Sequence, residues 1–419
     1  MLLKFRTANV RSLREEQELS FVVPQGEESD AARALELSDG KSLQVYPVLG
    51  VFGANASGKS NVVTALKKMR EAVLSSYGPW TSYTGIPHRE PFALDPKTAA
   101  ESTFYEVDFV LDDGVRWTYG FELGDKRVES EWLHAYPKGR RQVWLDRDAS
   151  RQSVYEFPGD RVQDRARLAR TTRANALLVS RAASDNHPQL SRIYGWFRSN
   201  LWDITPETEL RQREAYTAER LLDETTRDRV QELLRVADLG IQGAEVKRQP
   251  GDNAPTVKLL HGGSGDEPVA FDWANESFGT RSWFALIGPL LLALDSGAVL
   301  LIDELDASLH PRFAAEVVRL FQAPWSNTNQ AQLLFTSHDA SLLKTPRGGR
   351  SLDPGQIWLT EKDKSGATEL YPLSDIDPGP DEDLADSYLA GAFGGVPNVT
   401  QGQIGRKVLT VLAGEAERS

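Results

Sequence analysis

The sequence of 419 residues contains no cysteine. This absence excludes disulfide bonds, thiolate metal sites and cysteine nucleophiles, and it fits a reducing compartment. Long apolar runs are also missing: the longest, from Trp283 to Leu294, contains Gly288 and Pro289 and is too short to cross a bilayer. The first residues lack the basic, apolar and cleavage segments of a signal peptide. We therefore expect a cytoplasmic protein that does not contact a membrane.

Positive charge is in short supply, with 48 Lys and Arg against 60 Asp and Glu and a net charge of −12. This balance argues against general affinity for nucleic acid, which requires a positive surface. One run of arginines departs from it, at Arg161, Arg165, Arg167, Arg170 and Arg173. A solvated face with internal ion pairs is the commoner fate of such a run, but DNA stays open as a partner.

What the sequence does contain is a complete phosphate loop. Residues 53–60, Gly-Ala-Asn-Ala-Ser-Gly-Lys-Ser, follow an apolar run and precede a helical pattern over Asn61–Val73. The motif requires this context, because the strand delivers the loop and the first N–H groups of the helix point at an anion. We expect Lys59 to reach the β and γ phosphates of a nucleotide and the Ser60 hydroxyl to ligate Mg²⁺. The predicted nucleotide-binding residues are Gly53, Asn55, Ser57, Gly58, Lys59, Ser60 and Asn61.

A pair of carboxylates supplies the second half of an ATP site. The run Ala298–Ile302 has no polar residue, as expected for a parallel strand buried on both faces, and Asp303 and Glu304 follow it directly. An acidic residue in this place holds Mg²⁺ in phosphate-loop enzymes, so we predict that role for Asp303. Glu304 is the predicted general base for the attacking water. The alternative, that both are merely the first polar residues after a strand, is weakened by the phosphate loop.

Three further elements agree with an ATP site. His338 follows the predicted strand Leu333–Thr336, where its imidazole can hydrogen-bond the γ phosphate. The segment 306–311 is placed for a loop between subunits, ahead of a helix. Ser277 and Gly279 precede an apolar helix and make a second anion site, suited to ATP held by a facing subunit. Each signal is modest alone, and their order and spacing carry the prediction.

The remaining pattern predicts an α/β fold. We expect a phosphate-loop ABC-ATPase head, in which helices flank a mixed, mainly parallel sheet, with an antiparallel β subdomain and a helical insert. Alternating apolar residues predict antiparallel strands over Thr103–Leu111, Arg116–Leu123, Val128–Ala135, Gln142–Asp146 and Val154–Phe157. The predicted division is a first half of the head at 1–160, a helical insert at 161–239 and a second half at 240–419. A polar segment over 24–41 predicts a surface loop, and Gln356–Thr360 predicts an edge strand.

The whole set resembles the ABC-type ATPase heads of the SMC, RecF and OLD group. Its Walker A, signature, Walker B, D-loop and switch histidine match 53–61, 277–280, 300–304, 306–309 and His338. The opening segment 5–13 resembles the first strand of the group, which implies that Arg11 lies near the nucleotide. The chain is most similar to the compact bacterial AAA-type ATP-binding proteins of abortive-infection and phage-defence operons, through stretches at 91–95, 276–280 and 388–397.

The sequence departs from this group in three respects. Phe278 and Thr280 replace a Gly and the Gln of the transporter signature. No Gln occurs between Asn61 and Arg141, so the glutamine that helps to hold Mg²⁺ has no clear equivalent, and His88 or Arg89 are the candidates to replace it. The segment between the two halves lacks the sustained heptads of SMC arms.

The resemblance implies an ATPase that binds ATP and Mg²⁺ between two copies of itself. By the same resemblance, it would control a separately encoded effector protein in phage defence. Two alternatives stay open: a RecF-like repair ATPase that binds DNA, and a nucleotide-gated scaffold with little turnover.

Overall fold

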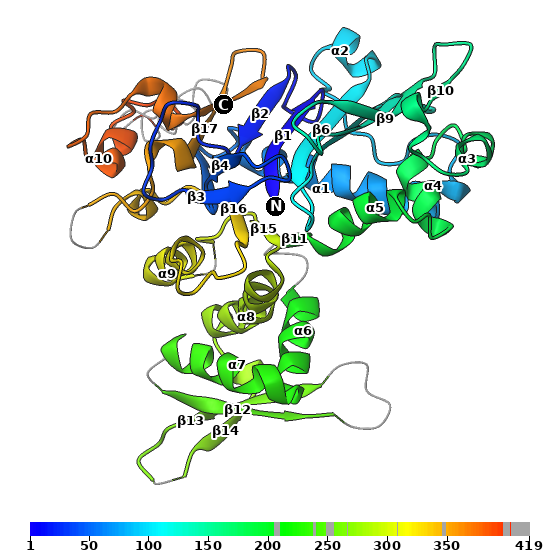
Figure 1. The fold of residues 1–419 in the computed structure, drawn as a ribbon. Coiled ribbons are helices and arrows are strands. Elements are labelled where there is room, and N and C mark those ends of the chain that lie inside the picture. Colours follow the sequence, from blue (N-terminus) through cyan, green and yellow to red (C-terminus); the bar gives the residue numbers. More distant parts are fainter. Residues whose placement is uncertain are drawn as a thin grey trace, which may run out of the picture.

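Two β-sheets form the body of the protein (Figure 1). The computed structural model describes residues 1–204, 210–237, 240–248, 255–265, 267–307, 309–345, 349–396 and 403. The seven-stranded sheet is antiparallel and has the order β10-β9-β8-β7-β6-β1-β2. Its strands are β1 (Leu2–Ala8), β2 (Gln17–Ser20), β6 (Thr103–Val110), β7 (Arg116–Leu123), β8 (Val128–Ala135), β9 (Gln142–Asp148) and β10 (Tyr155–Glu156). The predicted antiparallel strands are therefore confirmed, apart from small shifts at their ends.

The six-stranded sheet carries the phosphate loop and has the order β11-β15-β16-β5-β17-β18. All neighbouring pairs are parallel except β17 and β18. The strands are β5 (Val48–Gly53), β11 (Leu201–Ile204), β15 (Val299–Ile302), β16 (Gln332–Ser337), β17 (Ile357–Lys362) and β18 (Thr368–Pro372). Every residue of β5, β15 and β16 is buried, which explains why the sequences of β5 and β15 are apolar without interruption; β16 also buries the polar residues Gln332, Thr336 and Ser337.

Two apolar cores lie on opposite faces of the parallel sheet. Leu49 and Val51 of β5 face the first core, which also contains the antiparallel sheet, α1, α4 and α5. Val48 and Phe52 face the second core, which contains α6 to α10. The helices are α1 (Lys59–Ser75), α2 (Pro96–Ala100), α3 (Arg165–Thr171), α4 (Leu178–Ser184), α5 (Leu190–Ser199), α6 (Leu210–Leu222), α7 (Glu224–Ala237), α8 (Phe278–Ser296), α9 (Pro311–Gln322) and α10 (Leu384–Leu389).

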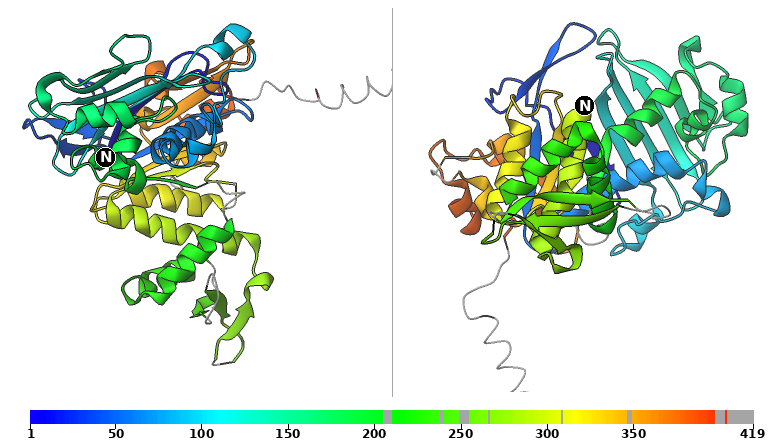
Figure 2. Two further views of the ribbon diagram at one scale, coloured as in Figure 1. Left: turned by 90° about the vertical axis from the view of Figure 1, so that its right-hand side faces the viewer. Right: turned by 90° about the horizontal axis from the view of Figure 1, so that it is seen from below.

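A smaller part of the chain projects from the body beside α8 (Figures 1 and 2). It consists of α6, α7 and the antiparallel sheet β12 (Ile241–Lys247), β13 (Thr256–His261) and β14 (Val269–Asp272). Helix α6 packs closely on α8, where the Thr217 hydroxyl accepts a hydrogen bond from the Gly288 N–H at 3.1 Å. A side chain at Gly288 would collide with that hydroxyl, so the glycine permits the close approach.

The structure departs from the sequence predictions in three places. Residues 161–239 are not helical throughout, because β11 interrupts them and pairs with β15 in the parallel sheet. The predicted surface loop over 24–41 contains half of a hairpin, formed by β3 (Arg33–Glu36) and β4 (Ser42–Val45). Strand β17 is an inner strand between β5 and β18 instead of an edge strand. The division at residues 160 and 239 stays a prediction.

Candidate functional site

The phosphate loop connects β5 to α1 and has the backbone that its glycines permit. Gly53 has φ +157° and Gly58 has φ +113°, and the helix begins at Lys59. A Cβ atom at Gly58 would lie 2.2 Å from the Thr368 hydroxyl, so any side chain there would collide with the strand beneath. The first turn of α1 contains no acidic residue, and its free N–H groups are available to an anion.

Lys59 is almost completely buried, with 7% of its surface exposed. Its Nζ donates hydrogen bonds to the carbonyl oxygens of Gly53, at 2.7 Å, and Ala54, at 3.0 Å. Burial lowers the pKa of Lys59, while the negative charges of Glu304, Asp306 and Asp303 act in the opposite direction. The ammonium group is therefore held inside the loop by neutral carbonyls, which a phosphate would outcompete.

The two predicted carboxylates lie beside Thr336, which sequence reasoning did not identify. The Thr336 hydroxyl donates to Asp303 Oδ1 at 2.6 Å and accepts from the Glu304 N–H at 2.7 Å. These contacts exist because β15 and β16 are parallel neighbours whose carboxyl ends meet. Glu304 has φ +52° and an exposed side chain. Oδ2 of Asp303 has no hydrogen-bond partner among the described residues.

His338 forms a pair with Asp306. His338 Nδ1 lies 3.0 Å from Asp306 Oδ2, with the histidine side chain 58% exposed and the aspartate 5% exposed. The second oxygen, Asp306 Oδ1, is buried and has no hydrogen-bond partner in the described part of the chain. Ser308, in the same predicted loop, lies outside the described residues.

Arg11 lies at the first turn of α1, and its predicted place near a nucleotide stays a prediction. Its Nη1 donates to Asn61 Oδ1 at 3.3 Å, and its Nε pairs with the Glu90 carboxylate, which also accepts from Lys68 at 2.9 Å. Burial raises the pKa of Glu90, but the hydrogen bonds from Arg11 and Lys68 outweigh it and lower that pKa overall.

The structure does not favour Arg89 as a replacement for the missing glutamine. Its side chain is 5% exposed and pairs with Asp125. It also donates to the Glu101 and Ala99 carbonyls, both at 2.8 Å. The guanidinium group therefore connects neighbouring loops, and its donors are already used. His88, the other candidate, has φ +58° and offers its carbonyl to Lys68 at 3.1 Å.

Ser277 and Gly279 lie at the start of α8, at the projecting part. The Ser277 hydroxyl accepts from the Thr280 N–H at 3.1 Å and caps the helix. Both predicted residues are exposed, as is Phe278 at 61%. No described contact joins them to the phosphate loop of the same chain. Lys59, Asp303, Glu304 and His338 follow three adjacent strands of one sheet.

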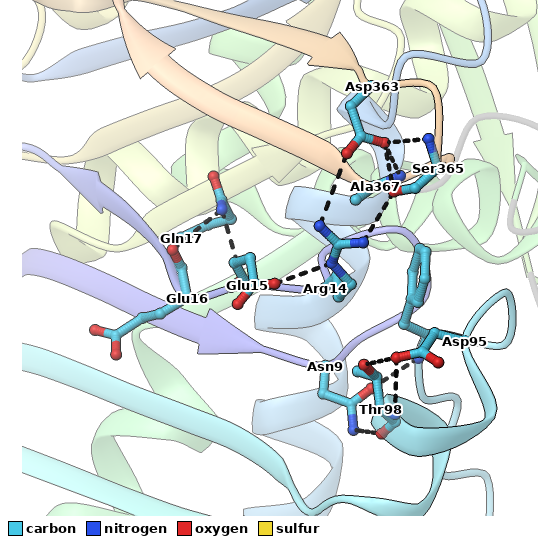
Figure 3. Close-up of polar contacts among 11 residues, drawn as sticks. Asn9, Arg14, Glu15, Glu16, Gln17, Asp95, Thr98, Asp363, Ser365 and Ala367 are labelled. Atoms are coloured by element: carbon cyan, nitrogen blue, oxygen red, sulfur yellow. Dashed lines mark hydrogen bonds and ion pairs between the residues drawn. The ribbon is translucent and has the colours of Figure 1, made fainter.

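Asn9 holds the opening segment in place and was not predicted (Figure 3). It has φ +54° and is buried; its side chain donates to the Thr98 carbonyl at 2.7 Å and accepts from the Phe92 N–H at 2.8 Å. Figure 3 also shows Arg14 reaching the turn between β17 and β18, where it donates to Ser365 at 2.9 Å. The turn that carries Arg11 and Ser12 is thus anchored on both sides.

Tyr388 connects the late segment around 388–396 to the phosphate loop. Its hydroxyl donates to the Gly395 carbonyl at 3.3 Å and interacts with the backbone of Gly53, the first glycine of the phosphate loop. Burial raises the pKa of Tyr388 to about 12, so the hydroxyl keeps its proton at neutral pH. The ring also packs against Phe52 of β5, with 6.3 Å between ring centres.

The arginine run makes mainly internal contacts. Arg165 pairs with Asp160, Arg167 pairs with Asp185 at 2.9 Å, and Arg173 donates to the Tyr77 carbonyl at 2.6 Å. Arg161 donates to the Pro158 carbonyl at 2.7 Å. These contacts favour the interpretation of the run as a solvated face with internal pairs over a DNA-binding face.

The residues present fit a nucleotide with Mg²⁺. The two glycines leave a loop that side chains would fill, and a buried ammonium group lies within it. Ser60 offers a hydroxyl at the helix start, and Asp303 offers an oxygen that no described residue uses. Hydroxyl and carboxylate oxygens are the ligands that Mg²⁺ prefers.

The strand order and the loop after β5 define the class of this protein as a phosphate-loop ATPase head, with the antiparallel sheet and helices predicted for the ABC-type group. Comparison with known families supports the class directly. Residues 48–344 match the model of a family described as "AAA domain, putative AbiEii toxin, Type IV TA system", and because the match covers more than half of the chain, the protein belongs to that family.

Solved structures of SMC heads are similar to this chain at low identity. The SMC head domain from Thermotoga maritima is 15% identical, with a TM-score of 0.42, and the match covers 88% of this chain and 98% of that one. A Smc head with an extended coiled coil, bound to the C-terminal domain of ScpA derived from Pyrococcus furiosus, is 14% identical, with a TM-score of 0.43, over 90% and 97% of the two chains. No curated protein matches the sequence significantly. Among the described residues, no helix is both long and apolar enough to span a membrane.

Proposed function

We propose that this protein hydrolyses ATP to ADP and phosphate, as a nucleotide-gated dimer that controls a separate effector. One observation carries the proposal. Lys59, the carboxylate pair at Asp303 and Glu304, and His338 follow the three adjacent parallel strands β5, β15 and β16. Since the carboxyl ends of parallel strands meet at one edge of a sheet, charge-binding, metal-binding and proton-accepting groups converge there.

In this proposal each group has one task. Lys59 exchanges its loop carbonyls for the β and γ phosphates, and the exposed Glu304 carboxylate accepts a proton from the attacking water. His338, oriented by Asp306, donates a hydrogen bond to the γ phosphate. Mg²⁺, held by Ser60 and Asp303, would neutralise charge that develops on the phosphates.

A second copy of the chain completes the site. Ser277 and Gly279 are exposed at the start of a long helix, and no described contact brings them to the phosphate loop of their own chain. A helix N-terminus with free N–H groups binds anions, so it suits the γ phosphate held by a facing copy. Binding of ATP would then close the dimer and hydrolysis would reopen it.

The family description supports a role in defence. It names a putative AbiEii toxin and a type IV toxin–antitoxin system. We propose that the protein acts in the cytoplasm, in an anti-phage system, and that a partner chain carries the effector chemistry. The projecting part formed by α6, α7 and β12–β14 is the element that would pass the opening of the dimer to that partner.

Hydrolysis and dimerisation test the proposal together. We expect Lys59→Ala to abolish ATP binding and Glu304→Gln to stop turnover while trapping an ATP-bound dimer, detected by light scattering after size-exclusion chromatography. Exposed Lys97→Ala and Glu101→Gln are the matched controls and should behave as wild type. Full hydrolysis by Lys59→Ala would contradict the assignment. A wild-type dimer that forms with ATP but turns over negligibly would favour the scaffold.

A further inference from the structure

Beneath the phosphate loop, three side chains and one carbonyl form a continuous chain of hydrogen bonds. Asn61 Nδ2 lies 2.6 Å from Ser12 Oγ, and Ser12 Oγ lies 2.7 Å from Thr368 Oγ1. Thr368 Oγ1 lies 2.7 Å from the carbonyl oxygen of Ser57, inside the loop. Next to it, the Ser57 and Thr360 hydroxyls are 2.6 Å apart. Three distant parts of the sequence, the opening turn, the loop and the hairpin β17–β18, are joined by these contacts.

Thr368 is the donor in both of its contacts. Its hydroxyl lies 2.7 Å from the Ser57 carbonyl and 2.7 Å from Ser12 Oγ, which also accepts from the Asn61 amide. A carbonyl only accepts, so the bond to Ser57 depends on the single proton of the Thr368 hydroxyl. Thr368 is 3% exposed, so water does not compete for that proton.

The consequence for the loop follows from peptide geometry. In a planar trans peptide the C=O and N–H groups point in opposite directions. Thr368 holds the Ser57 carbonyl on the side of β18, so the N–H of Gly58 in the same peptide points the other way, into the loop. That side is where Lys59 and the N-terminus of α1 lie. The absence of a side chain at Gly58 is what allows Thr368 to approach.

We propose that Thr368 is a positioning residue for nucleotide binding: through the Ser57 carbonyl it holds the phosphate loop ready for phosphate before ATP arrives. The inference rests on the proposed function of that loop. Thr368 touches no phosphate itself. Without its hydroxyl, the loop must be ordered at the moment of binding, and part of the binding free energy is consumed by that ordering.

The test compares Thr368→Val, which keeps the shape and removes the hydroxyl, with Thr368→Ser, which keeps the hydroxyl. Affinity is measured by titration with Mg²⁺ and a non-hydrolysable ATP analogue. We expect Thr368→Val to weaken binding about ten-fold, the scale of one lost buried hydrogen bond, and Thr368→Ser to stay within about two-fold of wild type. The matched control is Thr7→Val, because Thr7 is equally buried but donates only to the Phe104 carbonyl at 2.8 Å, in the antiparallel sheet.

Each outcome decides something. If Thr368→Val binds as wild type, or if Thr7→Val weakens binding equally, the positioning role is wrong. If Thr368→Val fails to fold, Thr368→Ala takes its place, because it removes the same hydroxyl; weaker binding of about ten-fold supports the proposal and unchanged binding overturns it. Loss of binding in Lys59→Ala with no effect of Thr368→Val would overturn this inference and leave the ATPase proposal intact. No binding by the wild type would overturn both.

Discussion

Two buried carboxylates in this protein have opposite surroundings. Glu131 of β8 is fully buried, and both of its oxygens are occupied: one by the Tyr119 hydroxyl and the Val179 N–H, the other by Arg147 and the Leu178 N–H. Asp306, at 5% exposure, pairs with His338 through one oxygen and leaves the other without a partner in the described structure. Both carboxylates are therefore buried, but only Glu131 has a hydrogen-bond partner for each of its oxygens.

The difference indicates a structural role for Glu131 and a ligand-binding role for the groups around the phosphate loop. Glu131 accepts from the first N–H groups of α4 and so fastens that helix to the antiparallel sheet. Groups of the protein itself supply all of these hydrogen-bond partners. At the phosphate loop and the carboxylates beside it the surroundings differ: Lys59 is buried against neutral carbonyls, and Asp306 keeps a buried oxygen without a partner among the described residues. An incompletely satisfied buried group is costly, and it is the arrangement expected where a ligand completes the network.

The largest effect is expected at the saturated carboxylate. Glu131→Ala leaves Arg147, two helix N–H groups and the Tyr119 hydroxyl without their partner, so it should lower the free energy of unfolding by about 3–5 kcal/mol. Urea denaturation measures the loss. The double variant Glu131→Ala with Arg147→Met should be less destabilised than the single one, since no buried charge is stranded. Equal losses in both would contradict the account of Glu131.

Next in size is the response to nucleotide at Lys59. Because burial lowers its pKa, the folded protein binds that proton less tightly than the unfolded chain, and the charged lysine opposes folding. Lys59→Met should therefore be at least as stable as wild type without ATP. It should lose the ligand-induced gain, about 2.7 kcal/mol at a hundred-fold excess over Kd. Thermal melting with and without Mg²⁺ and ATP gives both values, and a destabilised apo variant would be unexpected.

The unsaturated carboxylate should affect turnover more than folding. Asp306→Asn preserves the shape but weakens the orientation of His338, and we expect hydrolysis to fall about ten-fold. The free energy of unfolding should change by less than about 1 kcal/mol, in contrast to Glu131. Steady-state phosphate release and urea denaturation, measured on the same preparation, test the contrast. If Asp306→Asn lost as much stability as Glu131→Ala, the contrast between the two carboxylates would be wrong.

The smallest effect concerns Glu90, whose carboxylate is 41% exposed. Its pKa is lowered in the folded protein, so the stability it contributes is present above its unfolded pKa of about 4.5 and is lost as the pH falls through the folded value. Glu90→Gln should weaken the pH dependence of the free energy of unfolding below pH 5. Because solvent screens this exposed group, we expect the change to be about a few tenths of a kcal/mol. Melting temperatures between pH 3 and 6, with Glu101→Gln as the control, would reveal the difference.

Local pattern was sufficient for the elements that carry strong periodicity. The strands β6 to β9 alternate, β5 and β15 are apolar throughout, and the phosphate loop has every residue of its motif. The short strands β11, β14 and β18 were not recognised, since four or five residues in a charged or mixed context carry no period of their own. Each takes its conformation from the strand beside it, which for β11 is the distant β15 and for β14 and β18 is the strand that precedes it in the sequence.

The sequence by itself determined which groups are available for chemistry: a phosphate loop with Lys59 and Ser60, the carboxylates Asp303 and Glu304, and an imidazole at His338. Only the tertiary structure decided which neighbours make those groups work. Thr336, Thr360 and Thr368 are ordinary threonines in the sequence, and they act because the order of strands in the sheet brings β16, β17 and β18 to the loop. A motif records covalent spacing, whereas a hydrogen bond between residues some three hundred positions apart depends on how the chain folds.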